Sequence, residues 1–166
     1  MTELKDHNLF AGVVSEPAVA YSSNKQESVL GILDVPMKSA LYSSEELAWI
    51  DLARKGITKS SISRIAAYLD LSVEELCLLL HISPRTWQRK ASLEVWDGDI
   101  AEHSLELAEL AAKGVEVLGS IPALQKWVRS PLKALGQRTP LSIMDYSKGI
   151  RMCMDVLGRL EHGVIS

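Results

Sequence analysis

Residues 71–91 read Leu-Ser-Val-Glu-Glu-Leu-Cys-Leu-Leu-Leu-His-Ile-Ser-Pro-Arg-Thr-Trp-Gln-Arg-Lys-Ala and carry the signals for two short helices joined by a tight turn. In the first part, Ser72 and Glu75 have the spacing of a capping box, and an apolar helical face follows them. In the second part, Ser83 suits an N-cap and Pro84 suits the first position of a helix. The spacing predicts a helix-turn-helix, whose second helix would enter the major groove of DNA.

The predicted second helix, residues 84–91, gathers hydrogen-bond donors near its start. Arginine suits bidentate contact with guanine and glutamine suits contact with adenine, whereas hydroxyl and ammonium groups suit phosphate. The predicted DNA-binding residues are Ser83, Arg85, Thr86, Gln88, Arg89 and Lys90. Trp87 lies among them, but its apolar ring is expected to hold the helix to the core rather than to stack on a base.

The formal net charge of −3 is unevenly distributed along the chain. Residues 54–91 hold seven basic and three acidic side chains, residues 1–53 hold three and eight, and residues 92–166 hold eight and ten. A basic segment within an acidic chain fits the electrostatic footprint of a phosphate backbone. A helical hairpin with a solvated basic face would show the same charges, so both interpretations stay open at this point.

The composition predicts an all-α fold. Hydrophobic residues make up 47% of the chain and aromatic residues only 5%, and Leu, Ala, Ile and Val dominate. Such a composition favours helices over a sheet. No apolar run approaches the roughly 18 residues that span a bilayer, and residues 1–10 do not resemble a signal peptide. Cys77 and Cys153 lie in apolar helical patterns and are expected to be reduced and buried, which points to the cytoplasm.

Capping and stop signals predict further helices around the central pair. A helix is expected from residue 43 to a stop at Gly56, a second from a cap at Thr58, and a long one over residues 100–118 that stops at Gly119. Another begins at Ser120, followed by short turns at the prolines. The last helix is expected over residues 148–160, with an inner face formed by Ile150, Met154, Leu157 and Leu160. Residues 29–35 fit either a short strand or an apolar segment that packs on the core.

Signals for an enzyme or a cofactor site are missing from the sequence. The four histidines are His7, His81, His103 and His162, and none has metal-ligand spacing to a cysteine. The sequence has no glycine-rich phosphate loop. The sequence therefore predicts a non-enzymatic protein with no cofactor and no metal.

The run from Leu71 to Lys90 resembles the Xre-like helix-turn-helix of Xre/MbcA/ParS-type antitoxins. That pattern has an Arg-Thr pair followed by two basic residues, which here are Arg89 and Lys90 instead of two arginines. This helix-turn-helix pattern is shared by many regulators, so it is only moderately specific.

The C-terminal part resembles the toxin-binding region of the same family more specifically. The matching segments are Trp127-Val-Arg-Ser-Pro131, Ala134-Leu-Gly-Gln-Arg-Thr-Pro-Leu141, Gly149, and Val156-Leu-Gly-Arg-Leu-Glu-His-Gly163. Gln137 stands where the family often has a second glycine. The resemblance covers residues 43–166.

The resemblance implies an antitoxin that neutralises a RES-domain toxin, which looks like an ADP-ribosyltransferase and depletes NAD. It also implies repression of the shared operon through operator DNA, by a homodimer or a larger toxin–antitoxin assembly. The toxin-binding residues it implies are Trp127, Leu135, Gly136, Pro140, Leu141, Gly149, Arg159 and Glu161. Several of these also fit purely structural roles: the glycines and Pro140 in turns, and Trp127 as a core anchor.

The expected organisation is a partly disordered N-terminal arm over residues 1–42, an Xre-like helix-turn-helix DNA-binding domain over residues 43–98, and a small helical toxin-binding domain over residues 99–166. The alternative is a helix-turn-helix transcriptional regulator or an interaction module without a toxin partner. Gel-shift assays with and without a partner would separate these possibilities.

Overall fold

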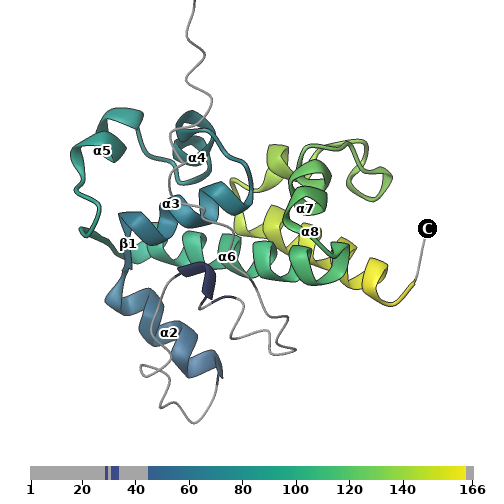
Figure 1. Cartoon of the computed structure of the whole chain (residues 1–166), viewed down its shortest axis with the longest axis horizontal. Helices are drawn as coiled ribbons and strands as arrows, with labels where there is room; N and C mark the ends of the chain where they lie inside the picture. The colour runs from purple at the N-terminus through teal and green to yellow at the C-terminus, as the bar shows by residue number, and fades with distance from the viewer. Residues whose placement is uncertain (1–28, 30, 34–44, 164–166) are drawn as a thin grey trace, which may run out of the picture.

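The computed structural model describes residues 29, 31–33 and 45–163, and this part of the chain is mostly helical, as predicted (Figure 1). The α-helices are α2 (Glu45–Lys55), α3 (Lys59–Tyr68), α4 (Val73–Leu79), α5 (Pro84–Arg89), α6 (Gly98–Leu118), α7 (Ile121–Val128) and α8 (Ser147–Glu161). Two short 3-10 helices, η2 (Lys133–Leu135) and η3 (Pro140–Ile143), lie between α7 and α8.

Helices α4 and α5 form the predicted helix-turn-helix. The capping box of α4 is present, because Ser72 Oγ accepts from the Glu75 amide at 3.1 Å and the Ser72 amide donates to Glu75 Oε2 at 2.9 Å. Ser83 Oγ accepts from the Thr86 amide at 3.0 Å and so caps α5, with Pro84 at the start of the helix. The helix ends at Arg89, two residues before the predicted end at residue 91.

A two-stranded antiparallel ribbon closes the helix-turn-helix segment, and the sequence analysis did not predict it. Strand β1 (Ile57–Thr58) pairs with β2 (Val95–Trp96), with Ile57 opposite Trp96. Two residues per strand are too few to show an alternating apolar pattern. Gly56 has a φ of +81°, and a Cβ there would lie 2.5 Å from the Trp96 carbonyl oxygen, so this glycine both ends α2 and lets the ribbon approach.

Helix α6 runs through the centre of the molecule and joins its two parts (Figure 1). It contacts α2 and α3 from the N-terminal part and α7 and α8 from the C-terminal part. It ends at Gly119, as predicted, with that residue in the left-handed conformation that glycine favours. The two parts of the chain therefore share one supporting helix.

Helix α8 packs along α6, and its inner face differs from the predicted one. The buried α8 residues are Gly149, Ile150, Cys153, Val156 and Leu157. Leu160 was expected on this face, but it is 40% exposed, so that expectation was wrong. Helical phase does not explain this exposure, because at 3.6 residues per turn Leu160 falls between Cys153 and Val156. Leu160 instead lies in the last turn of α8, beyond the last buried residue, Leu157.

An apolar segment before α2 packs on the core. Val29, Ile32 and Leu33 are buried, and Ser61 Oγ of α3 donates to the Leu33 carbonyl at 2.6 Å. Residues 29 and 31–33 are helical, so a strand over 29–35 was the wrong alternative and the core-packing segment was the right one. The rest of the predicted arm, residues 1–28, 30 and 34–42, lies outside the described residues.

Both cysteines are free and buried, as predicted. Burial raises the pKa of the Cys153 thiol to about 12, which suppresses the thiolate form needed for nucleophilic chemistry. Among the described residues, no helix has the length and apolarity required to cross a membrane. The same part of the chain holds no group of three or more His, Cys, Asp or Glu residues placed to bind a metal ion.

Candidate functional site

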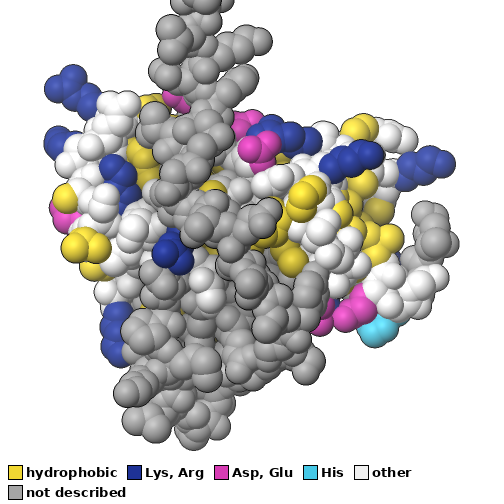
Figure 2. Space-filling model, in the orientation of Figure 1, with side chains coloured by type: hydrophobic (Ala, Val, Ile, Leu, Met, Phe, Trp, Pro, Cys, Tyr) yellow, Lys and Arg dark blue, Asp and Glu magenta, His cyan; other side chains and the backbone are white. Residues whose placement is uncertain are grey.

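Helix α5 presents three long polar side chains to solvent. The side chains of Arg85, Gln88 and Arg89 are exposed and make no hydrogen bond or ion pair to any residue in the described part of the chain. Figure 2 shows Lys and Arg side chains projecting at the edge of the molecule where Figure 1 places α5. These three predicted DNA-binding side chains are therefore available to a ligand.

Ser83 and Thr86 are less available than the sequence suggested. Ser83 Oγ accepts from the Thr86 amide and lies 2.8 Å from Thr86 Oγ1, so both hydroxyls serve the N-cap of α5. Thr86 is also only partly exposed. A contact to phosphate from either hydroxyl would compete with this local bond.

Lys90 is held by the ribbon rather than free. Its Nζ donates to the Val95 carbonyl at 2.6 Å, lies 3.8 Å from Glu94 Oε1, and sits 4.7 Å from the centre of the Trp96 ring. These contacts fix the end of α5 to β2. A role for Lys90 in phosphate binding stays a prediction, and it would require this ammonium to serve two sets of partners.

A stack of aromatic rings anchors α5 from behind. Trp87 is 2% exposed, and its ring stacks on Trp96 with centroids 6.1 Å apart and an interplanar angle of 15°. Lys59 Nζ covers the Trp87 ring at 5.1 Å and donates to the Lys90 carbonyl at 2.8 Å. Trp87 is thus a core anchor, as expected, and it fixes the direction in which α5 presents its exposed face.

The eight predicted toxin-binding residues fall into two groups. Trp127, Leu135, Pro140 and Gly149 are buried, and Leu141 is partly buried. Gly136, Arg159 and Glu161 are exposed. The buried residues pack within the C-terminal part, and a direct toxin contact for them stays a prediction.

Two of the predicted glycines have clear steric reasons. Gly149 lies against η3, where a Cβ would be 1.7 Å from the Ile143 carbonyl oxygen. Gly136 has a φ of +66° and closes the turn after η2. Both glycines therefore have the structural role that was considered for them from the sequence, at a turn or at a close approach of the backbone.

Glu161 is exposed but already paired. Its Oε2 lies 2.6 Å from Lys113 Nζ of α6, and this hydrogen bond lowers the pKa of the Glu161 carboxyl. The pair braces the end of α8 against α6. Arg159, in the last turn of α8, is exposed and has no such partner among the described residues.

Exposed apolar side chains on the C-terminal part were missed by the sequence analysis. Tyr146 is 66% exposed, and Met152 and Leu160 are each 40% exposed. The sequence held one signal for this exposure, because Met152 is an apolar residue that lies off the apolar stripe of α8. Such side chains lose water contact only when a partner covers them, so they are candidate contact residues.

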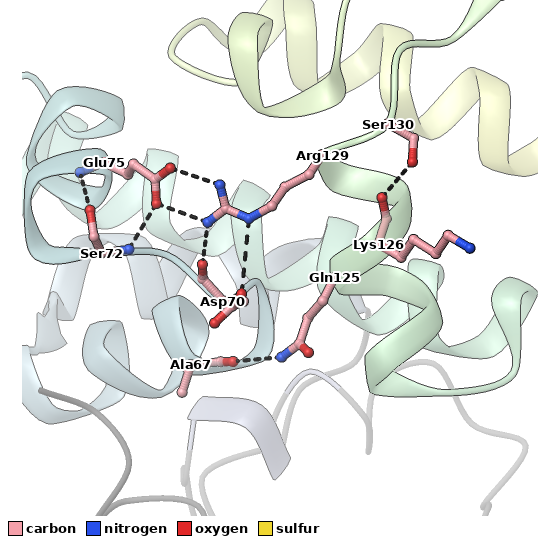
Figure 3. A network of polar contacts seen from close by, with 8 residues as sticks. All are labelled: Ala67, Asp70, Ser72, Glu75, Gln125, Lys126, Arg129 and Ser130. Atoms are coloured by element: carbon pink, nitrogen blue, oxygen red, sulfur yellow. Dashed lines mark hydrogen bonds and ion pairs between the residues drawn. The ribbon is translucent and has the colours of Figure 1, made fainter. Parts of the chain in front are cut away.

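A further polar cluster, also missed, joins the two parts of the molecule (Figure 3). Arg129, at the end of α7, donates through Nη1 to Glu75 Oε1 at 2.8 Å and through Nη2 to Glu75 Oε2 at 3.0 Å. Its Nη2 also donates to the Asp70 carbonyl at 2.5 Å. The guanidinium lowers the pKa of the Glu75 carboxyl, and Glu75 in turn raises the pKa of Arg129.

Comparison with known proteins shows which protein family has this architecture. Residues 48–109 match the Antitoxin Xre-like helix-turn-helix domain, and residues 113–163 match the Antitoxin Xre/MbcA/ParS C-terminal toxin-binding domain. The chain belongs to the Xre/MbcA/ParS-type antitoxin family. It is therefore a non-enzymatic antitoxin with a helix-turn-helix domain, and its C-terminal domain binds a toxin.

Two relatives of this antitoxin are similar at low identity over most of their length. It is 21% identical to "Antitoxin Xre" of Photorhabdus laumondii over 69% of this chain and 79% of the relative. It is 26% identical to "Prs ADP-ribosylating antitoxin" of Sphingobium over 76% of this chain and 86% of the relative. A shorter match to "Antitoxin Xre" of Yersinia enterocolitica is 45% identical but spans 24% of this chain and 27% of that protein.

A solved structure shares the antitoxin's fold. A chain from the crystal structure of the Mycobacterium tuberculosis MbcT–MbcA toxin–antitoxin complex superimposes with a TM-score of 0.50 at 23% identity. The superposition covers 65% of this chain and 96% of that chain. The likeness establishes a common fold.

Proposed function

We propose that this antitoxin neutralises a RES-domain, NAD-depleting toxin and represses its own operon through α5. The toxin class is supported by the resemblance of RES domains to ADP-ribosyltransferases and by the relative whose name refers to ADP-ribosylation. The match of residues 113–163 to a toxin-binding domain carries the proposal. We place this activity in the cytoplasm and assign toxin binding to the region 99–166.

The toxin contact is proposed to include the exposed side of α8 and the residue before it. Tyr146, Met152 and Leu160 offer apolar area, and Arg159 adds a cation without a partner among the described residues. Association that covers such side chains is favourable because apolar area leaves water. The buried members of the predicted set, Trp127 among them, would support this surface from below.

Co-expression with the RES-domain product of a neighbouring gene tests the toxin assignment. The antitoxin is expected to restore growth and the cellular NAD level. Met152→Asp is expected to lose this rescue, whereas Leu93→Asp keeps it. Leu93 is the matched control because it is an apolar side chain, 81% exposed, that lies between α5 and β2 in the helix-turn-helix part. Failure of the wild-type chain to rescue, with both proteins expressed, contradicts the RES assignment.

Operator binding is proposed for Arg85, Gln88 and Arg89, within the region 43–98. The net charge of residues 54–91 is modest for one protomer, so a homodimer or a toxin-bridged assembly would present two copies of α5 to a palindromic operator. Ser83, Thr86 and Lys90 keep a secondary role as phosphate contacts in this proposal.

A gel shift with the upstream DNA, with and without toxin, tests repression. Binding is expected to weaken steeply as salt rises from low to physiological concentration, because phosphate contacts release counterions. Binding that does not change over this range contradicts the role assigned to the basic segment. No shift in either form favours the alternative that the helix-turn-helix serves protein interaction.

A further inference from the structure

Helix α4, which supports α5, is held at its first turn by the C-terminal part of the molecule. Glu75 accepts hydrogen bonds from both terminal nitrogens of Arg129, and its Oε2 also accepts one from the Ser72 amide (Figure 3). A paired arginine–carboxylate contact fixes orientation as well as distance. The Glu75 carboxylate, which caps α4, is thus also the group that binds Arg129 at the end of α7.

The other end of α4 is held by the segment between η3 and α8. His81, in the turn after α4, donates from Nε2 to the Asp145 carbonyl at 2.8 Å, and its ring lies 5.7 Å from the Tyr146 ring. This segment is itself fixed to α6, because His103 Nε2 donates to the Met144 carbonyl at 2.8 Å. His81 has a φ of +54°, so the backbone turn that leads into α5 is the point of attachment.

A third contact lies beside the first. Gln125 of α7 donates to the Ala67 carbonyl near the end of α3 at 3.2 Å. Arg129 adds its bond to the Asp70 carbonyl in the connection between α3 and α4. The helix-turn-helix segment is therefore attached to the C-terminal part at three places: the end of α3, the start of α4 and the turn between α4 and α5.

We propose that Arg129 is a positioning residue for the DNA-binding helix α5, which it does not touch. Through Glu75 and Asp70 it fixes α4 on α7, and His81 fixes the far end of α4, so that the helix-turn-helix and the toxin-binding part act as one rigid body. A toxin seated on the C-terminal part would then set the spacing between two copies of α5 on DNA. This last step rests on the proposed function, whereas the rigid attachment does not.

Hydrogen exchange of the full chain without toxin or DNA tests the attachment. In Arg129→Gln, the amides of α4 and α5 are expected to exchange about tenfold faster, because this unit can open separately, while those of α6 and α8 keep their rates. Lys126→Gln is the matched control, since Lys126 is an exposed cation on the same helix with no side-chain partner among the described residues. Unchanged exchange in α4, or an equal increase over the whole chain, overturns the proposal.

Glu75→Gln provides a second variant, because its amide oxygen can still accept from the Ser72 amide and preserve the cap. It is expected to speed exchange in α4 and α5 as Arg129→Gln does. The double variant is expected to add little to either single change, since both remove the same contact. Fully additive effects contradict a shared contact.

The spacing of operator half-sites tests the consequence. In the toxin complex, insertion of ~5 base pairs, about half a helical turn, between footprinted half-sites should weaken wild-type binding strongly. Arg129→Gln should bind a single half-site as wild type does, yet discriminate less between the two spacings. Equal discrimination by both proteins overturns the positioning role. If the wild-type complex does not bind the upstream DNA, the proposed repression fails, and the exchange experiment still decides the attachment.

Discussion

Helix α5 and the segment from Trp127 to Gly149 both match family patterns, yet their matching residues lie in opposite environments. On α5, the pattern residues Arg85 and Arg89 are exposed, and Thr86 and Lys90 are partly exposed. In the later segment, the matching Trp, Leu, Pro and Gly positions are mostly buried. The C-terminal pattern, which is the more specific of the two, therefore marks mainly buried residues that support the surface. The helix-turn-helix pattern, which is less specific, marks residues whose side chains reach the surface.

This difference has a practical consequence for mutagenesis. Substitutions in the buried pattern should act on the free energy of unfolding, and substitutions on α5 should act on binding. Loss of toxin neutralisation therefore does not identify a contact residue unless stability is measured beside it. The predictions below test this separation.

Trp127→Ala should show the largest effect, a loss of about 3–5 kcal/mol in the free energy of unfolding, because a large buried ring is removed. Urea denaturation followed by circular dichroism measures it. Trp127→Phe should lose clearly less, since the Trp127 Nε1 has no hydrogen-bond partner among the described residues. A Trp127→Ala protein of wild-type stability that no longer binds toxin would make Trp127 a contact residue after all.

Gly149→Ala should destabilise the chain by about 3 kcal/mol, because the added Cβ would collide with the Ile143 carbonyl and push α8 away from η3. Thermal or urea unfolding measures the change. Gly158→Ala on the same helix is the control, since a Cβ there meets nothing within 4 Å. The control should be neutral or stabilising by about 0.5–1 kcal/mol, as alanine is the better helix former. Equal effects of the two substitutions would contradict the steric argument.

Arg85→Ala and Arg89→Ala should each weaken operator binding by about 1–3 kcal/mol and change the free energy of unfolding by less than about 0.5 kcal/mol. Both should still neutralise the toxin. Fluorescence anisotropy with labelled upstream DNA gives the first quantity, and the co-expression assay gives the second. Loss of both activities in folded variants would show that α5 also serves toxin binding.

Glu161→Gln should have the smallest effect, a change in how stability depends on pH. The hydrogen bond from Lys113 lowers the pKa of the Glu161 carboxyl below that of an ordinary glutamate. The pair therefore contributes fully above about pH 4.5, and its contribution is lost as the pH falls through the lowered pKa. Melting temperatures of Glu161→Gln should decline less over this acid range than those of wild type, with Asp155→Asn as an exposed control on α8. Identical pH profiles for wild type and Glu161→Gln would mean that the ion pair contributes nothing.

Local signals predicted much of the fold. The caps at Thr58, Ser72, Ser83 and Ser120 and the stop at Gly119 are where the sequence placed them, because capping depends on residues within one turn. Features that join distant segments were not predicted. The pairing of Ile57 with Trp96 is one such feature, and the bond between Glu75 and Arg129 is another.

The sites show the same limit. Arg85 and Arg89 could be predicted because exposure follows from helical phase and from the buried Trp87 beside them. Lys90 could not be distinguished from them by sequence, since its partners Val95 and Trp96 are brought to it only by the ribbon. Likewise, a family pattern cannot separate a buried Pro140 from an exposed Gly136.

The ribbon between β1 and β2 gives the segment from Ile57 to Trp96 adjacent ends, since these two residues are paired. A segment that enters and leaves a protein at one place can be exchanged as a cassette without moving the chain on either side. Specificity for DNA could therefore be transplanted between antitoxins by replacing this segment alone. A transplanted segment would need to keep Glu75 and His81, so that the new DNA-binding helix is attached to the C-terminal part through the same contacts.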